Sequence, residues 1–124
     1  MKRPGGEKNP NHPYRPLRSD FEDDPDLKDL VGMFVDDLNE RMKAVKTAFE
    51  TADEDQLRRL AHQIKGSAGG YGFGPIGDVA AELEYELLRE EADISQVQER
   101  VEDLASICRA AVRPSKDTGA GSNE

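Results

Sequence analysis

The sequence predicts an all-α protein: an antiparallel up-and-down four-helix bundle with disordered N- and C-terminal tails. Apolar residues recur at spacings of three and four along four successive segments, and no segment shows the apolar and polar alternation of a strand. With 124 residues and 35% hydrophobic content, the chain is expected to bury one modest core in a single domain. Four amphipathic helices joined by short loops bury their apolar stripes most simply around a common centre.

The two ends of the chain are predicted to be tails, residues 1–22 and 114–124, on either side of a bundle over residues 23–113. The first tail places Pro4, Pro10, Pro13 and Pro16 among glycine and charged residues, a composition that does not build a core. His12 lies in this tail, and we expect it to be exposed and without a role. The last helix stops at Pro114, and the residues after it are polar.

Two long helices come first. The first is predicted to begin at Asp24-Pro25, a cap followed by proline at the first helical position, and to end near Thr51. Its apolar stripe is Leu27, Val31, Phe34, Leu38, Met42, Val45 and Phe49. The second opens at Asp53, whose spacing from Gln56 resembles a capping box, and its stripe is Leu57, Leu60, Ala61, Ile64 and Ala68. A cluster of glycines ends it: Gly69, Gly70, Gly72 and Gly74.

The third helix restarts at Gly74-Pro75, with the apolar face Ile76, Val79, Ala80, Leu83 and Leu87. Asp93 and Gln96 repeat the capping pattern and open a last helix. Its stripe is Ile94, Val97, Val101, Leu104, Cys108 and Ala111. Cys108 is the one cysteine, and this position predicts a small core residue rather than a nucleophile.

Charge and hydropathy exclude several classes of protein. The net charge of −9 argues against nucleic-acid binding. No apolar run is long enough to span a membrane and the start of the chain lacks a signal peptide, so we expect a cytoplasmic protein, and its polar outer faces favour a monomer. The stretch 57–74 is positively charged, unlike the chain as a whole, because it holds Arg58, Arg59 and Lys65 and no acidic residue. These arginines either attract an acidic partner surface or form an ordinary solvated face.

One histidine is predicted to lie on the outside of the second helix. At roughly 100° per residue, His62 is about 200° from Ile64, while Lys65, Gly66 and Gly69 fall within about 60° of it. Glycine inside a helix costs about 1 kcal/mol relative to alanine, so the two glycines indicate close approach of another surface. An exposed imidazole is in large part neutral at pH 7 and has a lone pair that can accept a phosphoryl group.

The run Ala61-His62-Gln63-Ile64-Lys65-Gly66-Ser67-Ala68 resembles the active-site helix of histidine-containing phosphotransfer (HPt) domains, whose signature is His-x-x-Lys-Gly-Ser with a downstream glycine, here Gly72. Leu83-Glu84 matches a Leu-Glu pair common in the next helix of the family. The resemblance implies a phosphorelay carrier that exchanges phosphoryl groups with a histidine kinase or with receiver-domain aspartates of response regulators and hybrid kinases. It implies that His62 is phosphorylated, that Lys65 holds the phosphoryl oxygens and that Gly66 leaves room for the docking partner.

The resemblance also implies that the chain is a carrier rather than an enzyme. Nothing in the sequence supplies an acid cluster that would bind Mg²⁺, so we expect no cofactor or metal of its own and expect Mg²⁺ and most catalytic groups to come from the partner. We expect the partner to dock over Arg58, Arg59, Gly66 and Gly69. Ser67 either contacts the phosphate or bonds back to the carbonyl of Gln63, and the sequence leaves this open.

Other functions fit the sequence less well. A metal site needs several converging ligands, and the predicted bundle offers one histidine. Lys65-Gly66-Ser67 lies inside a helix and lacks the Gly-Lys-Ser/Thr order of a phosphate-binding loop. The alternative that stays open is a helical protein-protein interaction module without phosphotransfer, in which the glycines serve helix packing.

Overall fold

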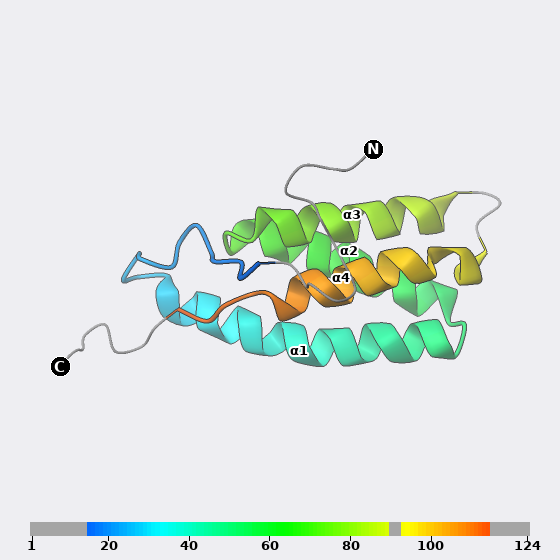
Figure 1. Cartoon of the computed structure of the whole chain (residues 1–124), viewed down its shortest axis with the longest axis horizontal. Coiled ribbons are helices and arrows are strands. Elements are labelled where there is room, and N and C mark those ends of the chain that lie inside the picture. The colour runs from blue at the N-terminus through cyan, green and yellow to red at the C-terminus, as the bar shows by residue number, and fades with distance from the viewer. Residues whose placement is uncertain (1–14, 90–92, 115–124) are drawn as a thin grey trace.

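Four α-helices form the body of the computed structural model, which describes residues 15–89 and 93–114. They are α1 (Lys28–Glu50), α2 (Glu54–Gly70), α3 (Gly74–Leu88) and α4 (Gln98–Arg109), with a short 3₁₀ helix, η1 (Ile94–Val97), before α4. The helices lie side by side along the length of the molecule (Figure 1). An isolated parallel bridge between Leu17 and Ala111 is the β pairing found in these residues. The predicted all-α class is confirmed, and no described helix is long and apolar enough to cross a membrane.

All four helices contribute to one hydrophobic core. The largest fully buried side chains include Leu38 of α1, Leu57 and Ile64 of α2, Ile76 and Leu83 of α3 and Leu104 of α4. Cys108 is also buried, and burial raises the pKa of its thiol to about 12. It is therefore the core residue that its helical spacing predicts.

The ends of the helices follow the predicted caps in part. The Asp53 carboxylate accepts a hydrogen bond from the backbone N–H of Gln56 at 3.2 Å, so α2 starts where expected. The start of α1 differs: Asp24 forms a separate turn, with its carboxylate accepting from the N–H of Asp26 at 2.8 Å, and the helix begins at Lys28. In the last predicted helix, the first turn is the 3₁₀ helix η1, and α4 ends at Arg109, ahead of Pro114.

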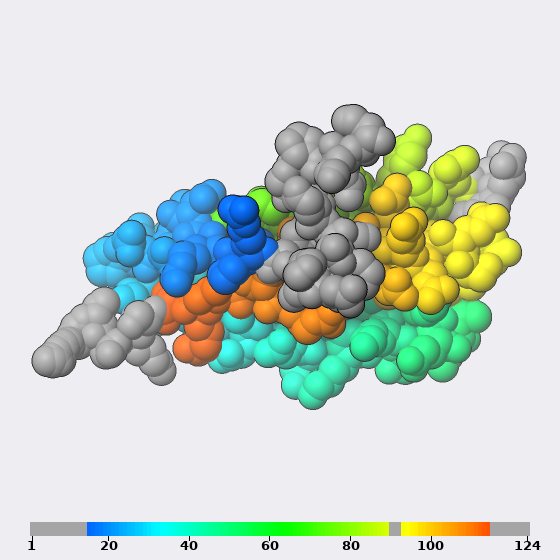
Figure 2. Space-filling model, viewed as in Figure 1, coloured from blue at the N-terminus to red at the C-terminus, as the bar shows by residue number. Residues whose placement is uncertain are grey.

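Residues 15–24, which we call the N-terminal strap, pack on the bundle, so the predicted tail boundary at residue 22 differs from the structure. Leu17 and Phe21 pack against the core, and Ser19 is 4% exposed. The N–H of Leu17 donates to the carbonyl of Ala110 at 2.7 Å, and the N–H of Val112 donates to the carbonyl of Leu17 at 2.9 Å. The strap therefore lies against the chain that follows α4 (blue beside orange in Figure 2). Residues 1–14, the rest of this tail, lie outside the described residues.

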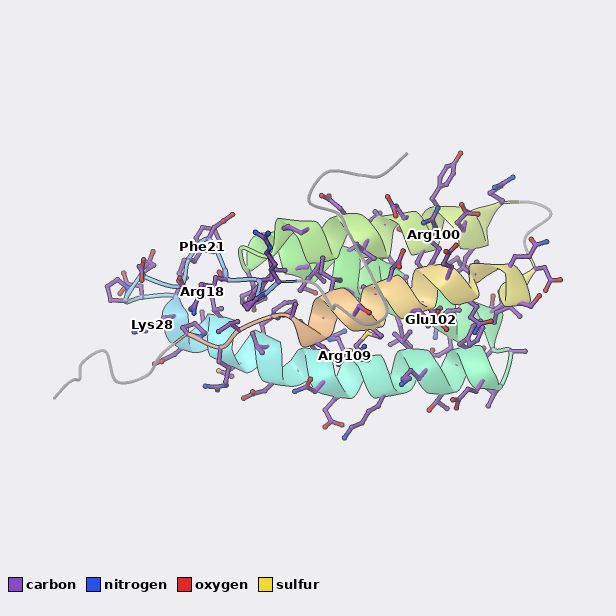
Figure 3. All side chains as sticks on the ribbon, in the orientation of Figure 1. Arg18, Phe21, Lys28, Arg100, Glu102 and Arg109 are labelled. Atoms are coloured by element: carbon purple, nitrogen blue, oxygen red, sulfur yellow. The ribbon has the colours of Figure 1, made fainter. Side chains whose placement is uncertain are left out.

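Three residues hold the strap against the bundle, and the overall composition of the segment did not predict their burial. The prolines and charges of residues 1–22 predict disorder, but Leu17, Ser19 and Phe21 supply apolar area and a hydroxyl that the bundle buries. Figure 3 shows Phe21 and Arg18 on the strap near Lys28 at the start of α1. A few buried side chains fix a segment whose average composition is that of a loop.

Ion pairs join the helices at the surface. The Arg113 guanidinium binds Asp36 of α1 through two hydrogen bonds of 3.0 and 2.9 Å, and this raises the pKa of Arg113. Arg100 of α4 (Figure 3) lies 3.7 Å from Glu82 and 3.9 Å from Glu86, both on α3. Such exposed pairs each contribute little to stability and mainly fix the position of the chain. Pro114, the first residue of the predicted C-terminal tail, is buried, and residues 115–124 lie outside the described residues.

The turn between α2 and α3 is held by the strap at Gly72. The Ser19 hydroxyl donates to the carbonyl of Tyr71 at 2.7 Å, and the N–H of Asp20 donates to the carbonyl of Gly72 at 2.9 Å. Gly72 has φ of +84°, the left-handed region that favours glycine. A Cβ at this position would lie 2.8 Å from the Asp20 nitrogen and 3.1 Å from the Phe21 ring. The downstream glycine is thus required both by its own backbone and by the strap.

We expect Gly72→Ala to lower the free energy of unfolding by about 1–3 kcal/mol, because the substitution adds left-handed strain and forces the strap away. Chemical denaturation followed by circular dichroism measures this loss. Gly70→Ala is the matched control, since a Cβ there meets no atom within 4 Å. The control should keep or gain stability, and an equal loss in both variants would contradict the account of Gly72.

Candidate functional site

His62 lies on the exposed side of α2, as the helical periodicity predicts. Its side chain is 65% exposed, whereas Ala61 and Ile64 on the opposite side are fully buried. The imidazole Nδ1 is 2.8 Å from Oε2 of Glu84 on α3. One nitrogen of the ring is therefore held by the neighbouring helix, and the rest of the ring faces solvent.

Glu84 joins both basic groups of the site. Its other oxygen, Oε1, lies 2.7 Å from the Lys65 ammonium, and its side chain is 13% exposed. The ammonium of Lys65 lowers the pKa of Glu84, burial opposes this effect, and the hydrogen bond from His62 lowers it further. Glu84 is therefore ionised at neutral pH, and its ion pair with Lys65 is lost only when the pH falls below the ordinary range of a glutamate.

The ionised carboxylate determines which nitrogen of His62 carries the proton. A carboxylate can only accept hydrogen bonds, so the nitrogen that faces it must donate. In the neutral ring this places the proton on Nδ1 and the lone pair on Nε2. The exposed edge of the imidazole is thus the nucleophilic edge.

Sequence reasoning missed this role of Glu84, although it noted the Leu83-Glu84 pair. A signal was present in two small residues, Gly77 and Ala81, which share one side of α3 with Glu84. A Cβ on Gly77 would lie 3.4 Å from the carbonyl oxygen of Lys65 and 3.7 Å from the nitrogen of Gly69, both on α2. The absence of a side chain at Gly77 allows α3 to approach α2 closely, and this approach brings the carboxylate to His62.

The glycines beside His62 have no packing role within the described structure. A Cβ built at Gly66, Gly69 or Gly70 meets no atom within 4 Å. Gly66 and Gly70 are exposed, like Gly69 between them. Beyond His62, toward the end of α2, the helix therefore presents bare backbone to solvent. This observation weighs against the interpretation in which these glycines serve helix packing.

The remaining predicted site residues bond mainly within α2. Arg58 pairs with Asp55 at 3.1 Å, and Arg59 donates to the neutral amide of Gln56 at 3.4 Å. The Ser67 hydroxyl donates to the carbonyl of Gln63 at 2.6 Å, so of its two predicted roles the structure shows the bond back to the helix. Arg58 is thus charge-paired one turn before His62, whereas Arg59, among the residues that the structure describes, contacts a neutral amide.

In the described part of the chain, metal-binding side chains do not cluster at the site. Within residues 15–89 and 93–114, no group of three or more histidine, cysteine, aspartate or glutamate side chains is arranged to hold a metal ion. Glu84, the acid nearest His62, is already bound to two basic groups. The side chains present can therefore offer an exposed nucleophile and a nearby ammonium.

Comparison with known proteins agrees with this geometry. A family model described as Hpt domain matches residues 29–113, a span that includes nearly all of α1 and the whole of α2, α3 and α4. No match was found among curated proteins or among solved structures. The family model covers well over half of the chain, and the match includes His62, Lys65 and Glu84. The chain belongs to the Hpt domain family.

Proposed function

We propose that this chain is a histidine phosphotransfer protein of a two-component phosphorelay that carries the phosphoryl group on His62. Membership of the Hpt family implies phosphotransfer through a histidine. The observation that carries the assignment to His62 is its exposed imidazole, whose Nδ1 lies 2.8 Å from the Glu84 carboxylate. His12, the other histidine, lies outside the described residues.

The reaction follows from the orientation of the ring. Nε2 attacks the phosphorus of an aspartyl phosphate on a receiver domain, an N–P bond forms, and the O–P bond breaks as the aspartate leaves as a carboxylate. The imidazole ring becomes cationic, and Glu84 stabilises this charge through the Nδ1 proton. The reverse attack by a second receiver aspartate returns the ring to its neutral form.

Lys65 is the residue of this chain that neutralises the transferred charge. Its ammonium lies one turn from His62 and is 40% exposed, so it can move from Glu84 toward the phosphoryl oxygens. Mg²⁺ and the acids that bind it come from the receiver or kinase, as does most of the stabilisation of the transition state. The chain acts as a carrier, and its partner supplies the catalytic groups.

The proposed partners are the receiver domain of a response regulator or hybrid kinase, and a histidine kinase. They dock over His62, with Gly66 and Gly69 giving room and Arg58 and Arg59 attracting acidic groups. An antiparallel up-and-down bundle is the arrangement proposed for the helices. It is supported by the hydrogen bond of Arg41 to Gln63 and by the stacking of Phe34 on Tyr71. We also propose a cytoplasmic location, and the polar outer faces of the helices favour a monomer.

We expect His62→Gln to abolish labelling, because glutamine keeps a polar side chain of similar reach but lacks the nucleophilic ring nitrogen. Transfer of labelled phosphate from phosphorylated receiver domains, followed by mass spectrometry at mildly basic pH, locates the label. The surface position makes the change nearly neutral for folding, within about 0.5 kcal/mol. Full labelling of the variant would defeat the assignment. A wild-type chain that takes no label from any donor would support the plain interaction module.

We expect Gly66→Gln to separate docking from stability. Glycine is the poorer helix former and a Cβ at this position meets no atom. The variant should therefore keep its free energy of unfolding or raise it by up to about 1 kcal/mol. Transfer from a receiver should nevertheless collapse, because the new side chain stands one turn from His62. Thermal melts and transfer assays on the same sample test both halves. A loss of stability, or normal transfer, would contradict the docking role.

We expect that in Glu84→Ala the neutral His62 ring is no longer held in a single tautomer. In the wild-type chain, nitrogen NMR of the neutral ring should show the proton mainly on Nδ1, and the variant should show a mixture of both tautomers. Transfer should slow because Nε2 loses part of its lone-pair population, with Lys65 no longer held. Lys65→Ala is the matched control: it should slow transfer and shorten the lifetime of phosphohistidine while the tautomer stays fixed. An unchanged tautomer in Glu84→Ala would refute the role of the carboxylate.

A further inference from the structure

Large apolar side chains are exposed on two helices of the described structure. They are Leu30 (44%) and Met33 (63%) on α1, and Tyr85 (69%) and Leu88 (62%) on α3. Single exposed apolar residues need no explanation, but neighbouring pairs next to a reactive group indicate a contact surface. The two pairs lie at different distances from His62, and the difference identifies which of them a partner bound at His62 would cover.

The α3 pair is continuous with the site. Glu84 faces α2, because it contacts both His62 and Lys65. Leu88 follows Glu84 by one helical turn and lies on the same side of α3, about 6 Å further along the axis. Tyr85 follows Glu84 in the sequence, and its side chain is exposed to solvent. Both residues therefore lie within about one helical turn of Glu84, the α3 residue that contacts His62.

The α1 pair lies farther away along α2. Phe34, the neighbour of Met33, stacks on Tyr71 with ring centroids 4.8 Å apart. Tyr71 follows α2 and is nine residues after His62, which corresponds to about 13 Å along a helix. A partner centred on His62 therefore meets the α3 pair first.

We propose that Tyr85 and Leu88 form the apolar anchor of the surface that binds the phosphoryl-exchanging partner of this chain. The inference rests on the proposed function and adds α3 to a docking face that the sequence placed on α2 alone. Aromatic and aliphatic side chains at the centre of an interface carry most of its binding energy. The partner it fits is a receiver domain with an apolar patch near its aspartate.

Charge on α2 adds to this description of the partner. Arg58 and Arg59 lie about one turn before His62 on α2, where Arg58 pairs with Asp55 and Arg59 contacts the neutral amide of Gln56. Glu84 pairs with the Lys65 ammonium and is hydrogen-bonded to His62, so its charge repels an approaching acid less than a free carboxylate would. The receiver surface that fits carries acidic side chains at the rim of its apolar patch.

The test compares two double variants that each replace two exposed apolar side chains. Tyr85→Gln with Leu88→Gln removes the proposed anchor, and Leu30→Gln with Met33→Gln is the matched control. Transfer rates are measured against the concentration of a phosphorylated receiver that labels the wild-type chain. Phosphoramidate, a small phosphoryl donor that needs no docking surface, is used in parallel. We expect the α3 variant to need about tenfold more receiver for half-maximal rate, equivalent to about 1.4 kcal/mol. The control should stay within about twofold of the wild-type value, and phosphoramidate should label all three proteins equally.

Several outcomes would overturn the inference. An α3 variant that transfers like the wild-type chain removes Tyr85 and Leu88 from the interface, while labelling of His62 leaves the proposed function intact. A larger loss in the α1 variant places the anchor on α1 instead. Loss of phosphoramidate labelling in the α3 variant assigns Tyr85 and Leu88 to the integrity of the site rather than to docking, and so overturns the inference. A wild-type chain that neither phosphoramidate nor any receiver labels defeats the proposed function and this inference with it.

Discussion

The Glu84 carboxylate is the group on which the arrangement of the site depends. It lies between the Nδ1 of His62 and the ammonium of Lys65, at 2.8 and 2.7 Å, and links α3 to α2 where both helices reach the surface. Because it is ionised, it fixes the proton of the imidazole, holds the lysine and leaves Nε2 facing outward. The close approach of the two helices at Gly77 makes this bridge possible. The same carboxylate therefore links two helices of the fold and orients the imidazole of the site.

Much of the fold was readable from periodicity and caps. The stripes of three and four residues identified the buried sides of all four helices, and Asp53 marked the start of α2, because capping and apolar spacing act over a single turn. The two errors have different causes. The later start of α1 reflects a local turn at Asp24 that takes the place of the first helical turn. The strap depends on contacts between Ser19 and Tyr71, residues far apart in the chain. Composition cannot report such contacts.

The site likewise has features that the helical period predicts and features that only the packing of helices determines. The exposure of His62 and the presence of Lys65 and Gly66 on its side of α2 follow from the helical period. The role of Glu84 depends on which residue of α3 faces α2, and thus on the packing of two helices. Gly77 carried that information, but only as a preference for close approach of the two helices. The bond of Ser67 back to Gln63 was one of two predicted outcomes, and the geometry selects it.

The strap has a consequence for the helix that carries His62. Gly66, Gly69 and Gly70 each cost about 1 kcal/mol in helix propensity relative to alanine, and all three lie in the last two turns of α2. An isolated peptide of this composition would fray from that end. Ser19 and Asp20 bind the carbonyls of Tyr71 and Gly72 directly after the glycines, so tertiary hydrogen bonds replace the order that local sequence does not supply. A surface without side chains is kept helical by residues more than forty positions away from it in the chain.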